Sequence, residues 1–426
     1  MTRRRPVAVS LFSGIGGLDS GIEAAGFEIR ACVEMDDVAR RTLRELHPKW
    51  PLLDHGDVCT LSGTELLGAI GLRRGELDLL VGGPPCQPFS RARAWAGPPP
   101  GRKDVRARTL AAFFRIAAET TPRVFLLENV PGLASSADQY LRRKVNQLSR
   151  RTNKNYSIAF VELQAADFGV PQRRKRLFLV GVRDGRPFAP PSATHAEVAD
   201  PVRGIERYRT AWDAIGHLDR DISPRELACT GQWARLLPSI PEGKNYLHHT
   251  PRGSGISLFG WRTRFWSFLL KLAKSEPSWT LSATPGPATG PFHWKNRRLS
   301  IREMAALQTI PLEREPNVSV LDARRLFGNA VPSVLGETLG LQIRREVFGE
   351  RHVRKRARLV PAARTDTPPP ETTGPVPPDY WGRQKEWLPH PGPGLGPGSS
   401  PARGRSPRAG SSLDAELNST ASRSAR

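Results

Sequence analysis

A cysteine stands in a loop that its neighbours make stiff. The segment from Gly82 to Ser90 reads Gly-Gly-Pro-Pro-Cys-Gln-Pro-Phe-Ser and follows the apolar run 77–81. Pro84 and Pro85 fix φ and lack an N–H, so the loop continues neither a helix nor a sheet ladder. We expect Cys86 at the carboxyl end of a parallel strand, where open α/β sheets bind ligands. Its thiolate would be a nucleophile, and the alternative is a small buried side chain on a tight turn.

An acidic residue follows a second apolar run. Glu128 comes directly after residues 124–127 and precedes Asn129, Val130, Pro131 and Gly132. Because carboxyl ends of parallel strands share one edge of a sheet, we expect Glu128 to face the same cleft as Cys86. Burial there would raise the pKa of the carboxyl, which suits a proton donor. The alternative is an acid that caps a helix.

The first 34 residues predict the unit that would position a ligand beside these groups. Residues 7–12 form an apolar run, Ser13-Gly14-Ile15-Gly16-Gly17 follows, and a helical pattern leads to a second apolar run that ends at Glu34. Strand, glycine turn, helix and strand ending in an acid is the nucleotide-type βαβ unit. Glu34 lies 20 residues after Gly14, the spacing at which an acid binds ribose hydroxyls.

These blocks together resemble the DNA (cytosine-5)-methyltransferase family, over residues 7–349. The resemblance is carried by Phe-Ser-Gly-Ile-Gly-Gly, Glu34-Met35-Asp36, Gly56-Asp57-Val58, Pro-Cys-Gln, Glu-Asn-Val, Gln172-x-Arg174-x-Arg176, the block from Arg297 to Pro311, and Gly328-Asn329-Ala330. It implies an α/β fold of the S-adenosylmethionine-dependent methyltransferases, Rossmann-like with a mostly parallel sheet. The implied cofactor is S-adenosylmethionine, held by Phe12, Gly14, Gly16, Gly17, Glu34, Met35, Asp57, Pro84 and Asn329.

The resemblance also implies the chemistry. Cys86 would add to C6 of cytosine while Glu128 protonates N3, after which C5 accepts the methyl group. Arg176 would contact the base and Arg174 a backbone phosphate. Since C6 is unreachable inside a stacked duplex, the cytosine must be flipped out of the helix.

Composition agrees with a polyanionic partner. The chain of 426 residues has a formal net charge of +23 and a pI near 10.9, and such a surplus favours nucleic acid. The cysteines at 32, 59, 86 and 229 form no Cys-x-x-Cys pair, which argues against a zinc site and a disulfide framework. No stretch approaches the ~20 apolar residues of a membrane helix, so we expect a soluble protein.

The resemblance, together with the composition of the tail, implies that the chain is divided into four segments. We expect a catalytic and cofactor-binding domain over 1–185, a target-recognition domain over 186–298, a return segment over 299–350 that completes the catalytic domain, and a disordered basic tail over 351–426. Arginines and tryptophans are interleaved in the second segment, a composition suited to phosphate contact, base readout and stacking. The tail is rich in Pro, Gly, Ser and Arg, and we expect it to be dispensable.

Several alternatives remain open on sequence alone. The same site could methylate cytosine in tRNA, the chain could be a catalytically silent DNA-binding protein, and a thiol hydrolase would need a histidine partner for Cys86. The resemblance implies a bacterial, cytoplasmic, nucleoid-associated monomer that acts on double-stranded DNA. It would protect host DNA beside a cognate restriction endonuclease, a functional rather than a physical partner, or act alone.

Overall fold

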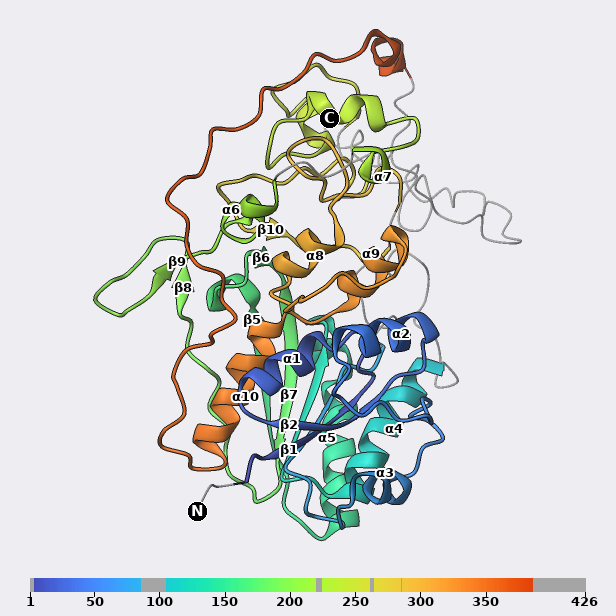
Figure 1. Cartoon of the computed structure of the whole chain (residues 1–426), viewed down its shortest axis with the longest axis vertical. Coiled ribbons are helices and arrows are strands. Elements are labelled where there is room, and N and C mark those ends of the chain that lie inside the picture. The colour runs from blue at the N-terminus through green and yellow to red at the C-terminus, as the bar shows by residue number, and fades with distance from the viewer. Residues whose placement is uncertain (1–3, 86–104, 220–223, 261–263, 285, 386–426) are drawn as a thin grey trace, which may run out of the picture.

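A six-stranded sheet forms the centre of the computed structural model, which describes residues 4–85, 105–219, 224–260, 264–284 and 286–385 (Figure 1). The strand order is β2-β1-β3-β4-β7-β5, and β7 runs antiparallel to both of its neighbours. The other adjacent pairs are parallel. The strands are β1 (Val7–Leu11), β2 (Glu28–Val33), β3 (Leu79–Gly82), β4 (Val124–Asn129), β5 (Ser157–Gln164) and β7 (Lys175–Val182). The expected mostly parallel α/β fold is confirmed.

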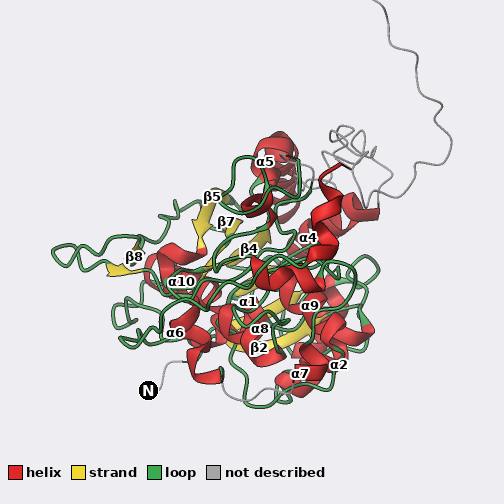
Figure 2. Ribbon diagram, turned by 90° about the horizontal axis from the view of Figure 1, so that it is seen from above, coloured by secondary structure: helices red, strands yellow, loops and turns green. Residues whose placement is uncertain are grey.

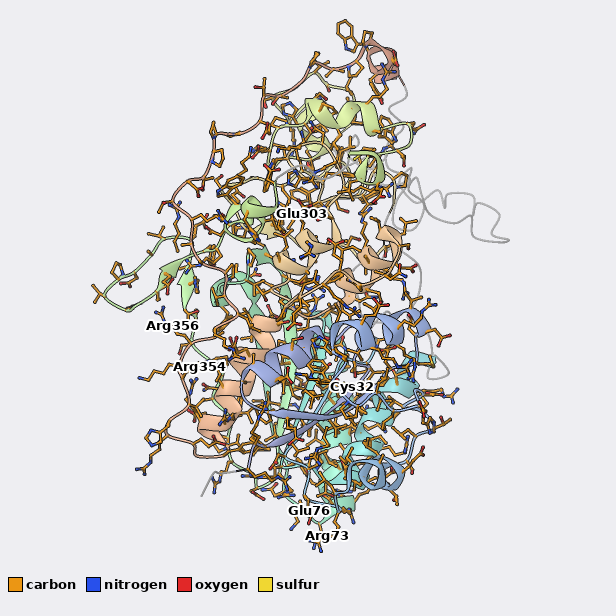
Figure 3. The ribbon with its side chains drawn as sticks, viewed as in Figure 1. Cys32, Arg73, Glu76, Glu303, Arg354 and Arg356 are labelled. Carbon is orange, nitrogen blue, oxygen red and sulfur yellow. The ribbon has the colours of Figure 1, made fainter. Side chains whose placement is uncertain are left out.

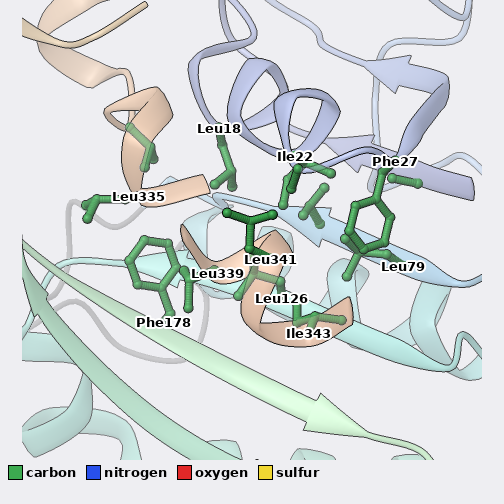
Figure 4. Close-up of a cluster of buried hydrophobic side chains, with 14 of the residues drawn as sticks. Leu18, Ile22, Phe27, Leu79, Leu126, Phe178, Leu335, Leu339, Leu341 and Ile343 are labelled. Carbon is green, nitrogen blue, oxygen red and sulfur yellow. The ribbon is translucent and has the colours of Figure 1, made fainter. Parts of the chain in front are cut away.

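Helices cover both faces of this sheet. One face packs against α1 (Gly17–Ala24) and α10 (Ser333–Glu346), and the other against α3 (Gly63–Ile70), α4 (Val105–Thr120) and α5 (Gly132–Thr152). Alternate residues of β1 and β4 point into the two cores, as the period of a buried strand requires. Figure 4 shows the first core, in which Leu18 and Ile22 of α1 meet Leu339 of α10.

Helices α1 and α10 are more than 300 residues apart in sequence but pack backbone to backbone. A side chain at Gly21 would lie 2.0 Å from the carbonyl oxygen of Ser333, and one at Gly336 would lie 2.4 Å from that of Leu18. The hydroxyl of Ser333 donates to the carbonyl of Gly17 at 2.8 Å. Glycine at these positions therefore allows the return segment to close over the N-terminal unit.

The remaining helices connect the domain of the six-stranded sheet with the 186–298 segment. A third core contains Ile15 and Ala39 from the N-terminal unit together with residues of α6 (Ala211–Ile215), α8 (Ile301–Leu307) and α9 (Val320–Asn329). Helix α2 (Asp37–Leu46) lies beside it. Ser300 and Glu303 form a capping box at the start of α8. The two parts are thus connected by a shared apolar core.

Residues 186–298 contain little regular structure. Most of this segment is loop, and the loop that carries β8 projects from the body (Figure 2). Its small core is built from residues such as Leu236, Tyr246, Phe259 and Phe268. The other short elements within it are β8 (His195–Ala196), β9 (Glu206–Arg207), β10 (Ser278–Trp279), α7 (Pro224–Leu227), and the 3₁₀ helices η3 (Gly216–Leu218), η4 (Ala234–Ser239) and η5 (Tyr246–His249). The 3₁₀ helix η2 (Ala165–Phe168) and the strand β6 (Gln172–Arg173) precede it. β10 pairs with β6 and so ties the segment to the sheet domain.

The expectation of a disordered tail from residue 351 is wrong for residues 351–385. This stretch runs along the whole molecule (Figure 1), with Val353, Leu359 and Val360 against the first core, and ends in the 3₁₀ helix η6 (Pro378–Lys385). Val376 and Tyr380 are buried in the core of the 186–298 segment. The sequence did not predict these contacts, because each buried apolar residue stands singly in a Pro-rich stretch. Residues 386–426 lie outside the described part of the chain.

Among the described residues, no helix combines the length and the apolar character needed to span a bilayer.

The glycine contacts give a stability prediction. Gly21→Ala should lower the free energy of unfolding by about 2 kcal/mol or more, since the added methyl group meets backbone atoms that have little freedom to move. The control is Gly68→Ala in α3, where a Cβ meets nothing within 4 Å; there alanine should stabilise the helix by roughly 0.5–1 kcal/mol. Denaturant unfolding measures both. Equal effects at the two positions would contradict this account of the interface.

Candidate active site

Several of the predicted site residues lie where β1, β3 and β4 end. Leu11 is paired with Gly82, and Gly82 with Leu127, so the three strands stop at one level. The order in which strands are added to the sheet reverses at β1, since β2 lies on one side of β1 and β3 on the other, although all three strands are parallel. That switch point is where doubly wound sheets bind ligands. Phe12, Gly83 and Glu128 are the next residues on the three strands.

Glu128 and Arg176 form an ion pair at this edge. Their Oε1 and Nε atoms are 2.8 Å apart, and both side chains are largely buried, at 12% and 14% exposure. β4 and β7 pair antiparallel here, which brings Arg176 beside the end of β4. Burial raises the pKa of Glu128, although the charges of Arg176 and Arg174 oppose the shift. The pKa shift of Glu128 has the predicted direction, and Arg176, which was expected to contact the base, lies against Glu128.

The start of the cysteine loop is attached to the same point. A side chain at Gly83 would lie 3.0 Å from Oε2 of Glu128, and the side-chain amide of Asn129 donates to the carbonyl of Pro84 at 3.3 Å. Pro84 is buried. Cys86 itself lies outside the described residues, two positions beyond this hydrogen bond.

Arg174 is buried, whereas a residue that binds a DNA phosphate would be expected at the surface. It is only 1% exposed, and its guanidinium donates to the carbonyls of Gly328 at 2.7 Å and Ala330 at 2.9 Å. A further N–H group lies 3.4 Å from the carbonyl of Leu281. Burial lowers the pKa of Arg174 well below its ordinary value, and the nearby Arg176 adds to the effect. Arg174 therefore holds the return segment against the sheet and presents nothing to a DNA backbone.

The loop after β1 has an open backbone and an anchored acid. Phe12 and Gly14 both adopt left-handed φ, at 56°, and a side chain at Gly14 would meet nothing within 4 Å. The amide of Gly14 donates to Oε2 of Glu34 at 2.8 Å, while Oε1 accepts from the amides of Met35 and Asp36. The acid at the end of β2 thus stands directly beside the glycine turn, as the spacing predicts.

The other two glycines of this turn lie close to protein atoms. A side chain at Gly16 would lie 2.7 Å from the Trp50 ring, and one at Gly17 would lie 2.5 Å from the carbonyl of Val331. Gly16 also has φ of 80°. These positions require glycine because protein atoms are close to them. Within the turn, Gly14 is the glycine whose surroundings are open.

The remaining expected cofactor residues surround this loop. Met35 is 68% exposed, unusual for a large apolar side chain and suited to a ligand's ring face. Oδ1 of Asp57 accepts from the amide of Cys59 at 2.8 Å, so Asp57 also stabilises a turn. Asn329 is exposed at the end of α9, between the two residues that Arg174 holds. Open backbone, a carboxylate and an exposed apolar side chain fit the parts of S-adenosylmethionine.

One acid at the site was not predicted. Asp19, in the first turn of α1, is 1% exposed, and neither carboxylate oxygen has a hydrogen-bond partner among the described residues. Burial raises its pKa to about 7; the Ser10 hydroxyl opposes the shift and Glu34 reinforces it. The sequence carries no signal of this, because an acid in a first helical turn is ordinarily a solvated favourable charge.

The described cysteines and histidines offer no rival centre. Burial raises the pKa of Cys32 well above its ordinary value, raises that of Cys59, and raises that of Cys229 to about 11, so these thiols are poor nucleophiles. Three histidines were considered as partners of a nucleophilic thiol, and each has other contacts. His47 stacks on Trp50 at 3.7 Å. His55 contacts Glu65 and Thr60, and His195 is buried beside Thr194.

The contacts of Arg174 give a second prediction. Arg174→Met should cost about 3 kcal/mol of unfolding free energy, because buried carbonyls lose their donors, and it should weaken S-adenosylmethionine binding by releasing Asn329. Lys175→Met, at an exposed neighbour in sequence, is the matched control and should be nearly neutral. Chemical denaturation and calorimetric titration measure the two effects. If Arg174→Met leaves stability intact and weakens DNA binding only, the arginine is a phosphate ligand after all.

Asp19 gives a prediction for pH. Its carboxyl ionises near 3.8 when unfolded and near 7 in the native state, so the native state holds the extra proton between these values. The free energy of unfolding should therefore fall as pH rises from 4 to 7, by on the order of 3 kcal/mol from this group.

Asp19→Asn should remove this part of the decline, whereas Asp37→Asn, at an exposed acid in the first turn of α2, should retain it. Denaturant titrations without cofactor across this range test the assignment. Parallel curves for the wild type and Asp19→Asn would refute it.

Comparison with known proteins covers most of the chain. The family model for C-5 cytosine-specific DNA methylases matches residues 7–345. The type II methyltransferase M.SacI of Streptomyces achromogenes is 36% identical over 365 residues, covering 80% of this chain and 92% of its own length. M.NgoFVII of Neisseria gonorrhoeae is 31% identical over 332 residues, covering 77% and 83%.

Solved structures agree on the fold. A triple-substitution variant of DNMT2 from Spodoptera frugiperda superposes with a TM-score of 0.56 at 17% identity, covering 79% of this chain and 99% of its own. Given the matched family model, the sheet topology and the site at its carboxyl edge, the chain belongs to the C-5 cytosine-specific DNA methylase family and is an S-adenosylmethionine-dependent DNA (cytosine-5)-methyltransferase.

Proposed function

We propose that Cys86, Glu128 and Arg176 carry out the methylation of a cytosine flipped out of double-stranded DNA. The observation that carries this proposal is the buried Glu128–Arg176 pair, which adjoins Gly83 and Pro84 at the start of the cysteine loop. A nucleophile on that loop and an acid at the end of β4 would then act on one ring from neighbouring strands.

Cytosine C5 is a weak nucleophile and needs activation. The Cys86 thiolate forms a bond to C6, and Glu128 donates a proton to N3, so the electron pair of the C5–C6 double bond becomes available at C5. S-adenosylmethionine, when bound, supplies the methyl group. Afterwards a base removes the C5 proton, the double bond re-forms, N3 returns its proton to Glu128, and Cys86 departs as thiolate.

The pKa of Glu128 fits the role of proton donor. Burial raises this pKa, which favours the protonated carboxyl that a proton donor needs. Arg176 opposes the shift in the free enzyme through its ion pair. When a base enters, the Arg176 guanidinium can bind the ring oxygen O2, and its positive charge also favours the Cys86 thiolate.

The cofactor residues follow from the loop geometry. Gly14 has an open backbone face, Glu34 lies beside it for the ribose hydroxyls, and exposed Met35 suits the adenine face. We assign Phe12, Asp57, Pro84 and Asn329 to the same cofactor site, because they lie near the loop that follows β1. Gly16 and Gly17 serve through packing that holds the turn.

Residues 186–298 are proposed to read the DNA sequence. They lie above the catalytic edge, share a core with the helices of the return segment, and contain exposed aromatic side chains at Phe265 and Trp266. We further propose a bacterial cytoplasmic enzyme, monomeric and associated with the nucleoid, that protects host DNA from a cognate restriction endonuclease. The similarity to type II methyltransferases supports this setting.

The direct test is transfer of labelled methyl groups from S-adenosylmethionine to unmethylated genomic DNA, with bulk tRNA in parallel. Label on DNA, mapped by bisulfite sequencing to cytosines within one short motif, is the expected result and identifies the site. Label on tRNA alone would overturn the proposed substrate.

The catalytic roles make a kinetic prediction. Cys86→Ser should lower turnover by at least ~10³-fold, and Glu128→Gln by ~10²–10⁴-fold, the ordinary contribution of a positioned proton donor. Binding of S-adenosylmethionine should remain. Cys59→Ser is the control and should keep normal turnover, because the Cys59 thiol has a raised pKa and a separate place behind Asp57. Normal turnover by either catalytic variant would remove that residue from the scheme.

A further inference from the structure

Residues 353–381, which follow α10, form an extended segment that we call the strap. The strap contacts both the catalytic domain and the 186–298 segment. It leaves the end of α10, passes the loop that carries β8 and β9, and reaches the far end of the 186–298 segment (Figure 1). Figure 3 shows Arg354 and Arg356 near its start, Arg354 beside α10 and Arg356 toward β8 and β9. The strap lies beyond residue 345, where the match to the family model ends.

The strap begins with an anchor on the catalytic half. Glu337 of α10 is fully buried, and its carboxylate accepts from the backbone amides of Arg358 and Leu359, both at 3.0 Å. Arg354 forms an ion pair with the same carboxylate. One buried acid thus fixes the strap by three donors, a geometry that a loosely attached tail would not provide.

The middle of the strap binds the first elements of the 186–298 segment. The carbonyl of Pro361 accepts from Nε of Arg209 at 2.8 Å, and the amide of Arg364 donates to Oδ1 of Asp213 at 2.6 Å. Asp213 is the capping-box acid of α6, whose other oxygen accepts from the amide of Thr210. The strap therefore contributes to the cap of α6, a helix of the 186–298 segment.

A buried lysine, Lys274, takes two of its hydrogen-bond acceptors from the strap. Lys274 is 3% exposed, and its ammonium group has three acceptors: Glu242 at 2.7 Å, Glu371 at 2.8 Å and the carbonyl of Pro369 at 3.2 Å. An ammonium has three donors, and the strap supplies acceptors for two of them. Burial alone would lower the pKa of Lys274, but its bonds to the two glutamates outweigh burial and raise it.

The strap ends on the wall of a cavity. The Tyr380 ring stacks on Trp233 at 5.8 Å, and its hydroxyl donates to the carbonyl of Gln232 at 2.5 Å. Gln232 and Trp233 line a cavity of about 420 Å³, together with Thr230, Arg264, Phe265 and Thr289. Arg264 lies over the Trp233 ring at 5.7 Å.

This cavity is connected to the catalytic edge through α9. The carbonyl of Thr289 accepts from Arg324 of α9 at 2.6 Å, and the hydroxyl of Thr230 accepts from Arg298 at 3.1 Å. Helix α9 ends at Asn329, beside the loop that follows β1. The cavity wall, α9 and the strap thus form one continuous set of contacts.

We propose that the strap is a positioning element for DNA recognition: it fixes the 186–298 segment over the catalytic half, and Tyr380 sets the position of Trp233 and Gln232 in a cavity that contacts the DNA bases. This inference rests on the proposed role of residues 186–298 in reading DNA. Tyr380 and Glu371 act through other residues and are not catalytic.

The test compares point variants of the full-length protein on three substrates: S-adenosylmethionine, a duplex carrying the site found by bisulfite mapping, and duplexes with one base pair of that site changed. Tyr380→Ala and Glu371→Gln should each raise KM for the cognate duplex about tenfold, the effect of one buried group losing its partner. Discrimination against changed sites should fall by a similar factor. KM for S-adenosylmethionine and kcat should stay within about twofold, because both arise at the distant strand ends.

Two matched variants sharpen the comparison. Tyr380→Phe keeps the ring stacked on Trp233 and should recover most of the discrimination that Tyr380→Ala loses. Thr372→Ala, at an exposed position next to Glu371, should behave as wild type. Calorimetric binding of S-adenosylmethionine shows for each variant that the catalytic half is folded; if Tyr380→Ala fails this check, Glu371→Gln and Tyr380→Phe carry the test.

Cavity variants separate the two proposals. If Gln232→Ala or Arg264→Met changes site preference while the strap variants match wild type, the strap proposal is overturned and the recognition role of 186–298 stands. If neither set changes site preference, the recognition role is overturned and the strap proposal with it. Equal loss of activity on every duplex, with an unchanged KM for DNA, would also overturn the strap proposal.

Discussion

The structure depends on the contact between the backbones of α1 and α10, which only residues without side chains permit. Gly21 and Gly336 bring the helices together, and Gly17 allows Val331 to lie against the start of α1. Through this contact, residues near the end of the chain complete a pocket that begins with its first strand. Arg174 reinforces the closure by binding the carbonyls on both sides of Asn329. A site made of two distant segments therefore becomes one rigid edge.

Chemistry at that edge follows from what surrounds each group. Glu128 is desolvated at the end of β4, so its proton is retained more strongly, and Arg176 keeps the charge balanced before a base arrives. Asp19 shows the same effect of burial without a partner. Two buried acids, one on α1 and one on β4, lower stability through their desolvation, which the apolar cores on both faces of the sheet offset. The desolvation that raises the pKa of Glu128 also strengthens its contact with Arg176.

Much of this arrangement was predictable from sequence, because local patterns fixed it. Apolar runs ending in Gly-Gly or Glu-Asn gave the strands and the residues at their ends, and Ser300 with Glu303 gave a helix start. What sequence alone could not supply were contacts between distant segments. Arg174 looked like one more cation in a basic run, yet it lies buried among carbonyls. The strap looked unfoldable because its anchors, such as Leu359, Val376 and Tyr380, are spaced singly among prolines. The burial of Asp19 could not be predicted, because α1 is covered by α10, a helix far away in the sequence.

The central claim, that Cys86 bonds to cytosine at the edge formed by Glu128 and Arg176, is tested most directly by a covalent trap. A duplex carrying 5-fluorocytosine at the methylated position blocks loss of the C5 substituent, so a thiol bonded to C6 remains attached. The account predicts a DNA–protein adduct that forms with S-adenosylmethionine and whose peptide, by mass spectrometry, carries the base on Cys86. An adduct on Cys59 or Cys229, or methylation of ordinary cytosine with no adduct on the fluorinated duplex, would contradict it.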